Sequence, residues 1–196
     1  ATVTVKNIHR GRIVVQKNAV NGSPEGWKFE IWQGDTLVET LTTGADGRAV
    51  SKYLLPGNYT VKEIHDRDGT YWEYDVKVEQ NATVTAGHDT TVTYTNTQYG
   101  RIQIIKTTNT SENLSGWQFE IVNKATGKVV QTVTTDASGY ATTDKLEPGS
   151  YIVREVGGGN AYWQLDTSGH TVTVVAGQTA TVTVKNIHRG RIVVQK

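Results

Sequence analysis

ATVTVKNIHRGRIVVQK, residues 1–17, recurs without a change at residues 180–196. Its first part, TVTVKN, alternates polar and apolar residues with a period of two, as at Val3 and Val5, which is typical of a half-buried strand. A short polar segment, IHRG, follows, and the apolar run RIVVQK comes after it. We interpret the stretch as the last strand of one domain, a linker, and the first strand of the next domain.

A second, diverged repeat lies inside this period, with matching blocks 89 to 92 residues apart. The matches are GRIVVQK (11–17) with GRIQIIK (100–106), GWKFEIW (26–32) with GWQFEIV (116–122), TTGADGRA (42–49) with TTDASGYA (134–141), LPGNYTVKE (55–63) with EPGSYIVRE (147–155), and TVTYTN (91–96) with TVTVKN (181–186). The chain is therefore expected to hold two homologous domains. We place them at residues 9–98 and 99–187, with residues 1–8 as the last strand of a preceding repeat and 188–196 as the first strand of a following one. The simplest interpretation of the repeated ends is that the sequence covers slightly more than one 179-residue period of a longer tandem array.

The composition favours an all-β fold, because many short Thr- and Val-rich segments are separated by Gly, Asn, Asp and Pro. About seven antiparallel strands per domain are expected, arranged as an immunoglobulin-like sandwich of two sheets. The segments ADGR and ASGY are typical of hairpin turns, in which Gly47 and Gly139 would adopt positive φ.

Charge and residue usage exclude several classes of function. The formal net charge is +1, with 20 basic and 19 acidic residues, so neither nucleic acid nor membrane insertion is expected. The absence of cysteine removes disulfides and thiol sites. The five histidines show no metal-ligand spacing, and no phosphate-binding loop is present, so we expect neither a metal nor a cofactor.

Three polar residue types recur at strand ends in both halves: a lysine, a glutamate and an asparagine. They are Lys17, Glu63 and Asn96 in the first half, and Lys106, Glu155 and Asn186 in the second. In NYTVKE the alternation puts Glu63 on the same face as Tyr59 and Val61. Such an acid lies either at the wet end of the strand or buried beside a partner.

The order of these motifs resembles the Cna-B type repeats of Gram-positive surface adhesins and pilins. In that family a lysine of the first strand and an asparagine of the last form a spontaneous intramolecular isopeptide bond, assisted by a buried acid. The resemblance implies a bond between Lys17 and Asn96 assisted by Glu63, and one between Lys106 and Asn186 assisted by Glu155. Asn7 and Lys196 would then be half-sites, each with its partner in a neighbouring repeat.

The physical chemistry of an apolar core makes these roles plausible. Burial disfavours charge, which favours a neutral amine and a protonated acid. The glutamate would donate a hydrogen bond to the asparagine carboxamide oxygen and shuttle the proton that lets ammonia leave. A cross-link closing a loop of about 80 residues would stabilise a domain by on the order of 4.5 kcal/mol. The reaction would turn over once, so the chain would not be an enzyme.

The resulting hypothesis is a structural repeat unit of an extracellular stalk, fibre or pilus-like filament on a Gram-positive-like cell, with neighbouring copies of the repeat as partners. The end strands would complete one another between chains in a variant of this hypothesis, with Lys196 reaching Asn7 of the next chain. An alternative is an adhesin that binds host protein or glycan through exposed aromatic loops around Trp72 and Trp163. An enzyme is the weakest hypothesis, because no multiple-turnover site is visible.

Overall fold

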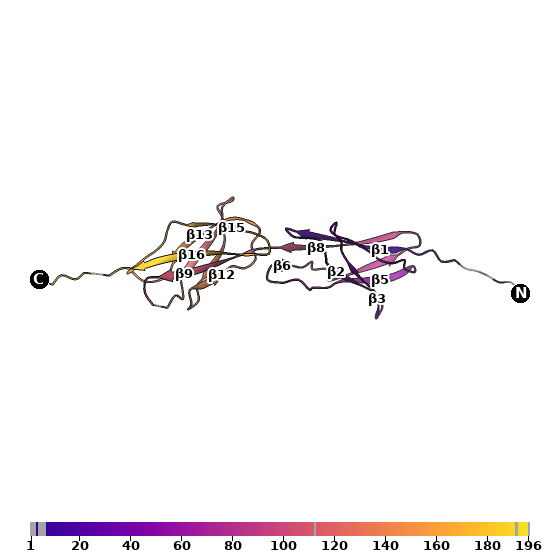
Figure 1. Cartoon of the computed structure of the whole chain (residues 1–196), viewed down its shortest axis with the longest axis horizontal. Helices are drawn as coiled ribbons and strands as arrows, with labels where there is room; N and C mark the ends of the chain where they lie inside the picture. The colour runs from indigo at the N-terminus through magenta and orange to yellow at the C-terminus, as the bar shows by residue number, and fades with distance from the viewer. Residues whose placement is uncertain (1–2, 4–6, 112, 191, 196) are drawn as a thin grey trace. The chain divides into compact units, whose positions relative to one another are not determined.

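The computed structural model describes residues 3, 7–111, 113–190 and 192–195 (Figure 1). All regular elements in these ranges are β-strands. No helix in the described part of the chain is long and apolar enough to cross a membrane. The chain divides into two compact units, residues 1–98 and 99–196, and each is described by itself.

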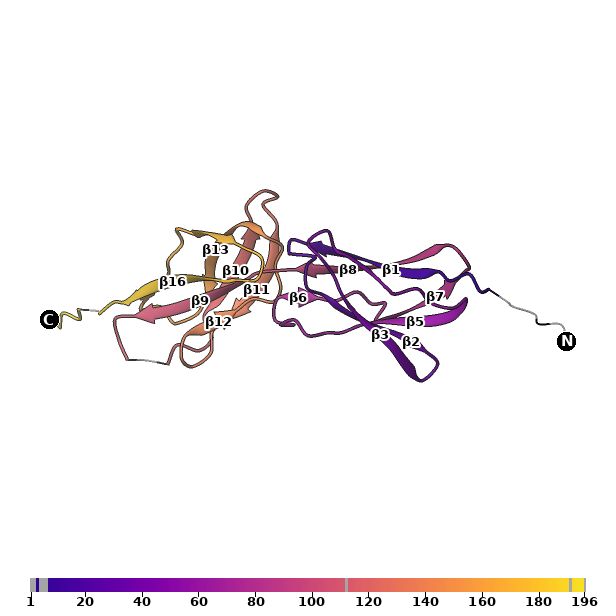
Figure 2. The ribbon, with the colours of Figure 1, turned by 45° about the vertical axis from the view of Figure 1, so that its right-hand side comes forward.

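The first domain consists of two four-stranded sheets, with strand orders β4-β1-β8-β6 and β3-β2-β5-β7 (Figures 1 and 2). Its strands are β1 (Arg12–Val20), β2 (Lys28–Gln33), β3 (Thr36–Thr42), β4 (Arg48–Val50), β5 (Gly57–Glu63), β6 (Trp72–Glu73), β7 (Glu79–Val84) and β8 (Asp89–Gln98).

The second domain repeats this topology, with strand orders β12-β9-β16-β14 and β11-β10-β13-β15. Its strands are β9 (Arg101–Thr108), β10 (Gln118–Asn123), β11 (Val129–Thr134), β12 (Tyr140–Thr142), β13 (Gly149–Gly157), β14 (Trp163–Gln164), β15 (His170–Val174) and β16 (Thr179–His188). The prediction of two tandem all-β sandwich domains is confirmed.

Two details of the fold differ from expectation. Within the described ranges each domain has eight strands, and its first and last strands are parallel, with β1 pairing β8 from Arg12↔Asp89 to Val20↔Thr97. The pair β9–β16 is parallel in the same way. A parallel pair needs a long crossover between its strands, and here the whole intervening domain provides it. The sequence alternation that marks each strand carries no signal of strand direction.

The turns at Gly47 and Gly139 form as predicted, with φ of 72° and 84°. They are not hairpins within one sheet, however. β3 and β4 on either side of Gly47 belong to different sheets, so this turn carries the chain from one layer of the sandwich to the other.

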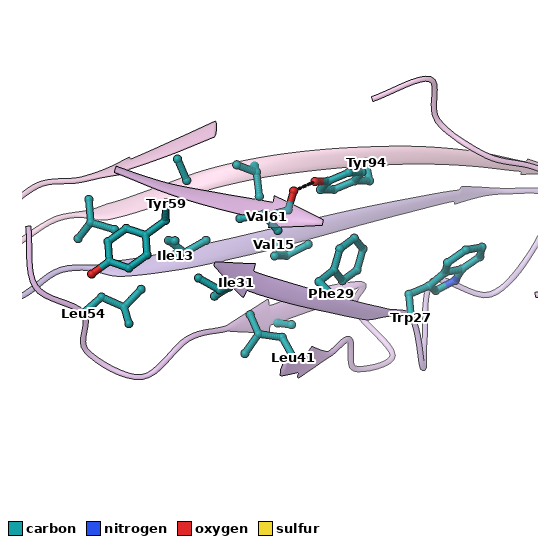
Figure 3. Close-up of a cluster of buried hydrophobic side chains, with 14 of the residues drawn as sticks. Ile13, Val15, Trp27, Phe29, Ile31, Leu41, Leu54, Tyr59, Val61 and Tyr94 are labelled. Carbon is teal, nitrogen blue, oxygen red and sulfur yellow. Dashed lines mark hydrogen bonds between the residues drawn. The ribbon is translucent and has the colours of Figure 1, made fainter. Parts of the chain in front are cut away.

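The core of the first domain lies between its two sheets and follows from the alternation of the strands (Figure 3). Ile13 and Val15 of β1 face Phe29 and Ile31 of β2, and all four are fully buried. Across the core, the Tyr94 hydroxyl of β8 donates a hydrogen bond of 2.7 Å to the backbone carbonyl of Val61. This hydrogen bond joins β8 of one sheet to β5 of the other.

The same alternation places the polar residues of interest. In β1 the inward positions are Ile13, Val15 and Lys17, so the lysine continues a column of apolar side chains into the core. β5 continues inward to Glu63 and β8 to Asn96, and both of these residues are buried. Three strands therefore deliver their polar residues to one end of the same core.

Candidate functional site

In the first domain, Lys17, Glu63 and Asn96 lie in direct contact. The Lys17 Nζ is 2.6 Å from the Glu63 Oε1, and neither side chain has any exposed surface. The Asn96 Nδ2 donates to both carboxylate oxygens at 3.2 Å. The amine and the carboxamide therefore meet at a single carboxylate oxygen, Oε1, and the chain brings together all three residues that the sequence singled out.

The second domain repeats this arrangement with small differences. The Lys106 Nζ is 3.1 Å from the Glu155 Oε1, an ion-pair distance without hydrogen-bond geometry. The Asn186 Nδ2 donates to the same oxygen at 2.9 Å. All three side chains are buried, so the two halves present the same donor set in the same kind of environment.

A tryptophan lies against the lysine in each domain. The Lys17 Nζ is 4.2 Å from the centre of the Trp27 ring, and the Lys106 Nζ is 4.3 Å from that of Trp117. Burial lowers the pKa of both lysines, although the adjacent glutamates oppose the shift. A larger fraction of each amine is therefore neutral than it would be in water, and a neutral amine is the nucleophilic form.

The contacts of the asparagine oxygen differ from expectation. The physical argument predicted that Glu63 would donate a hydrogen bond to the carboxamide oxygen, but Glu63 accepts hydrogen bonds from the carboxamide nitrogen instead. The Asn96 Oδ1 accepts a hydrogen bond of 2.7 Å from the backbone N–H of Asp75. In the second domain the backbone N–H of Asp166 donates to the Glu155 Oε2 at 2.7 Å, and the Asn186 Oδ1 has no hydrogen-bond partner among the described residues.

Sequence reasoning missed the aspartates, and it gave Trp27 and Trp117 a packing role without a contact to the lysines. Asp75 closes TYWEYD and Asp166 closes AYWQLD, at matched positions of the two halves. Comparing the halves would have singled them out. Their contact with the site depends on the path of the loops after β6 and β14, which alternation does not predict.

The aromatic residues proposed as ligand contacts lie deeper than expected. Trp72 is only 7% exposed and packs edge-on against Trp27, with ring centres 4.9 Å apart. The expectation of an exposed ring at Trp72 is wrong, because this side chain completes the core. Trp163 is half-buried and packs edge-on against Trp117.

The remaining sequence expectations concern the ends of the chain and metal binding. Asn7 is exposed, and Lys196 lies outside the described residues, so the half-site interpretation stays a prediction. Within the part of the chain that the structure describes, no group of three or more His, Cys, Asp or Glu side chains has the arrangement of a metal site.

Comparison with known proteins identifies two copies of one domain type. The family model described as the SpaA prealbumin-like fold domain matches residues 11–98 and again residues 100–188. These ranges contain both buried trios. No curated protein sequence matches the chain significantly.

Several solved structures have a similar fold. The Bacillus anthracis TIE protein is 23% identical over 92% of this chain, with a TM-score of 0.49, and the chain spans only 34% of its length. The minor pilin GBS52 of Streptococcus agalactiae is 16% identical, with a TM-score of 0.42 and coverages of 95% and 99%. The shaft pilin SpaA of Lactobacillus rhamnosus GG is 13% identical, with a TM-score of 0.41 and coverages of 93% and 99%. At these identities the likeness concerns the fold alone.

Proposed function

This chain belongs to the family of SpaA prealbumin-like fold domains, and from that membership we propose that it is a structural unit of an extracellular surface fibre or pilus whose domains are each closed by a Lys–Asn isopeptide bond. The observation that carries the proposal is the buried Lys–Glu–Asn trio, which recurs in both domains with a lysine–glutamate ion pair and an asparagine–glutamate hydrogen bond in each.

An unreacted trio lowers the stability of a small core, because it places two charged groups away from water. Removing a lysine and a glutamate from water costs several kcal/mol per ion, and an ion pair recovers this only with good geometry and further hydrogen bonds. Bond formation converts the ammonium into a neutral amide and leaves the acid protonated. The reaction therefore removes the buried charges. The free energy gained by removing them would explain why a lysine and a glutamate are buried together in the core.

The chemistry balances within the trio of the first domain. The Lys17 ammonium gives a proton to Glu63, and the freed lone pair of Nζ attacks the Asn96 Cγ while the carbonyl electrons move to Oδ1. Glu63 then protonates Nδ2 and takes a proton from Nζ. When the carbonyl re-forms, the Cγ–Nδ2 bond breaks and ammonia leaves. The products are a secondary amide, a neutral Glu63 carboxyl and one ammonia. Lys106, Glu155 and Asn186 would follow the same sequence.

The fold supplies the orientation that an amide exchange in water lacks. Lys17 and Asn96 are held on neighbouring strands, two residues out of register, since Lys17 pairs Tyr94 while Asn96 pairs Ala19. Both side chains point into the same end of the core. Fixing an amine beside a carboxamide in this way replaces a bimolecular encounter and accounts for much of the barrier.

Localisation and partners follow from the same proposal. We place the unit at the surface of a Gram-positive-like bacterium, with neighbouring copies of the repeat as its partners. The tandem domains and the absence of any cysteine suit a fibre that is stabilised covalently without disulfides.

Intact-mass measurement of the purified chain under denaturing conditions tests the proposal. The expected mass is lower than the sequence mass by two molecules of ammonia, one for each domain. Lys17→Ala and Lys106→Ala should each restore one ammonia, and the double variant should restore both. A wild-type mass equal to the sequence mass would sink the isopeptide proposal.

The adhesin alternative has less support in the structure. Trp72 belongs to the core, whereas Trp163 is half-buried and its neighbour Tyr162 is exposed. Tyr162 lines a shallow hollow with Arg189 and Gly190. Loss of adhesion in a folded Tyr162→Ala variant would favour this alternative over a purely structural role.

A further inference from the structure

We propose that the main-chain N–H of Asp75 polarises the Asn96 carbonyl during bond formation, and that the second domain lacks this donor and closes its bond more slowly. The inference rests on the isopeptide proposal above. Glu63 would transfer protons to and from the two nitrogen atoms, Nζ and Nδ2, and the Asp75 N–H would stabilise the charge on Oδ1.

The first observation is the direct contact with the reacting group. The Asp75 N–H donates to the Asn96 Oδ1 at 2.7 Å, while Glu63 accepts from Nδ2 of the same side chain at 3.2 Å. Negative charge develops on Oδ1 when Nζ attacks Cγ. A backbone donor already aimed at that oxygen stabilises this charge without rearranging, as in an oxyanion hole.

The second observation is the way in which the donor is held. The Asp75 carboxylate accepts hydrogen bonds from the backbone N–H groups of Lys77 and Thr95, both at 2.9 Å. Thr95 precedes Asn96 in β8. The side chain of Asp75 therefore fastens its own loop to the strand that carries the reacting asparagine, which makes it a positioning residue for its own N–H.

The second domain contains the matched aspartate but uses it differently. The Asp166 carboxylate accepts from the Ser168 N–H at 3.0 Å and pairs with His170 Nε2 at 2.8 Å. These bonds hold its own loop and the start of β15. The Asp166 N–H donates to Glu155, and no donor in the described part of the chain reaches the buried Asn186 Oδ1.

The negative charge of Asp75 offers a competing explanation with the opposite sign. This charge favours the protonated form of Lys17 and so raises its pKa. If charge were the whole contribution, removing it would free the amine and speed bond formation. A positioning role predicts that removing the carboxylate slows bond formation.

The test follows both bonds in the full-length chain as it is made. The chain is produced in a short pulse of cell-free synthesis, and samples are quenched in acidic denaturant at intervals. After digestion, the cross-linked peptides Lys17–Asn96 and Lys106–Asn186 are quantified by mass. The rate of each bond is counted from the completion of its own domain, and in the wild-type chain the first bond is expected to form faster than the second. Asp75→Ala should slow the first bond by about tenfold or more, in line with the loss of an oxyanion donor.

Two variants separate positioning from other effects. Asp75→Asn loses the charge but keeps an acceptor oxygen for Thr95, so it should retain most of the wild-type rate. Asp166→Ala is the matched control, and it should change the second bond less than Asp75→Ala changes the first. Tryptophan fluorescence of each variant checks that its domains are folded.

Some results of these measurements would overturn the inference about Asp75, and another would contradict the isopeptide proposal itself. Bonds that form at equal rates in the wild-type chain, or a second bond that forms faster, would overturn the inference, and this comparison needs no variant to fold. An unchanged or faster first bond in folded Asp75→Ala would overturn it too, as would an equal slowing by Asp166→Ala. Absence of both cross-linked peptides would instead contradict the proposed function.

Discussion

The buried lysine is the residue on which the first domain depends. Lys17 continues a column of isoleucine and valine, yet its ammonium group pairs with Glu63 and lies against the face of Trp27. A charge so placed is tolerated only while its counter-charge remains, because removing one member of a buried pair leaves the other uncompensated. The free energy of unfolding should therefore fall much more when one partner is removed than when both are removed.

Asn96→Ala provides a chain whose first domain keeps the Lys17–Glu63 pair but cannot react. In this background Glu63→Gln is expected to lower the free energy of unfolding by about 3–5 kcal/mol, because the ammonium loses its counter-charge. Adding Lys17→Met should recover most of the loss, since both charges are then gone. Urea unfolding followed by tryptophan fluorescence measures these values. Equal stabilities for the two variants would contradict the idea that the pair is charged.

The pH dependence of the same background follows from the lowered pKa of Lys17, which burial causes. The folded domain then binds fewer protons at this site than the unfolded chain, so the free energy of unfolding rises with pH. The rise should continue up to the pKa of an unfolded lysine, about 10.4. Urea midpoints measured from neutral to alkaline pH test this.

The control for that titration is the chain with both Asn96→Ala and Lys17→Met. Glu63, His65 and Asp75 remain near the site in both chains, so the difference between the two pH profiles isolates the lysine. A difference that falls as pH rises would mean that the pKa of Lys17 is raised in the folded domain.

At the scale of elements, the turn before β4 supports the strand that carries Lys17. The Lys17 N–H donates to the Gly47 carbonyl at 2.7 Å. Gly47 has φ of 72°, and a Cβ there would collide with the Lys17 carbonyl and touch Pro24. Both its backbone conformation and its surroundings therefore require glycine.

Gly47→Ala should lower the free energy of unfolding of the first domain by about 3 kcal/mol in the Asn96→Ala background, combining backbone strain with steric overlap. Gly34 is the matched control, because it also has positive φ but its Cβ would meet nothing. Gly34→Ala should therefore cost only about 1 kcal/mol. Equal losses for both variants in urea unfolding would show that the contact with Lys17 is not important.

Sequence alone predicted more about these elements than about their connections. Alternation placed Tyr59, Val61 and Glu63 on one face, and all three are buried. Repetition in the two halves added the lysine and the asparagine. The parallel pairing of β1 with β8 and the path of the loop that carries Asp75 were not predictable, because both depend on contacts between segments distant in sequence.

At the scale of the whole molecule, the position of each proposed bond determines how a pulled chain carries force. In a parallel pair of first and last strands, the chain enters at one end of the ladder and leaves at the other. With Lys17 joined to Asn96, the force path through the first domain runs from β1 to Lys17, crosses the bond and leaves through the end of β8. The residues between the two linked positions carry no load.

Stretching single molecules by their ends therefore distinguishes closed from open domains. The wild-type chain should show no unfolding step, because only a few residues at each end of a closed domain can extend. Lys17→Ala should add one step of roughly 250 Å, since about 85 residues become extensible at about 3.5 Å each, less the folded length. Lys17→Ala with Lys106→Ala should give two such steps. Steps of roughly 250 Å in the wild-type chain would mean that the force path does not cross a covalent bond. A wild-type chain without such steps would show how a domain that has no disulfide resists extension.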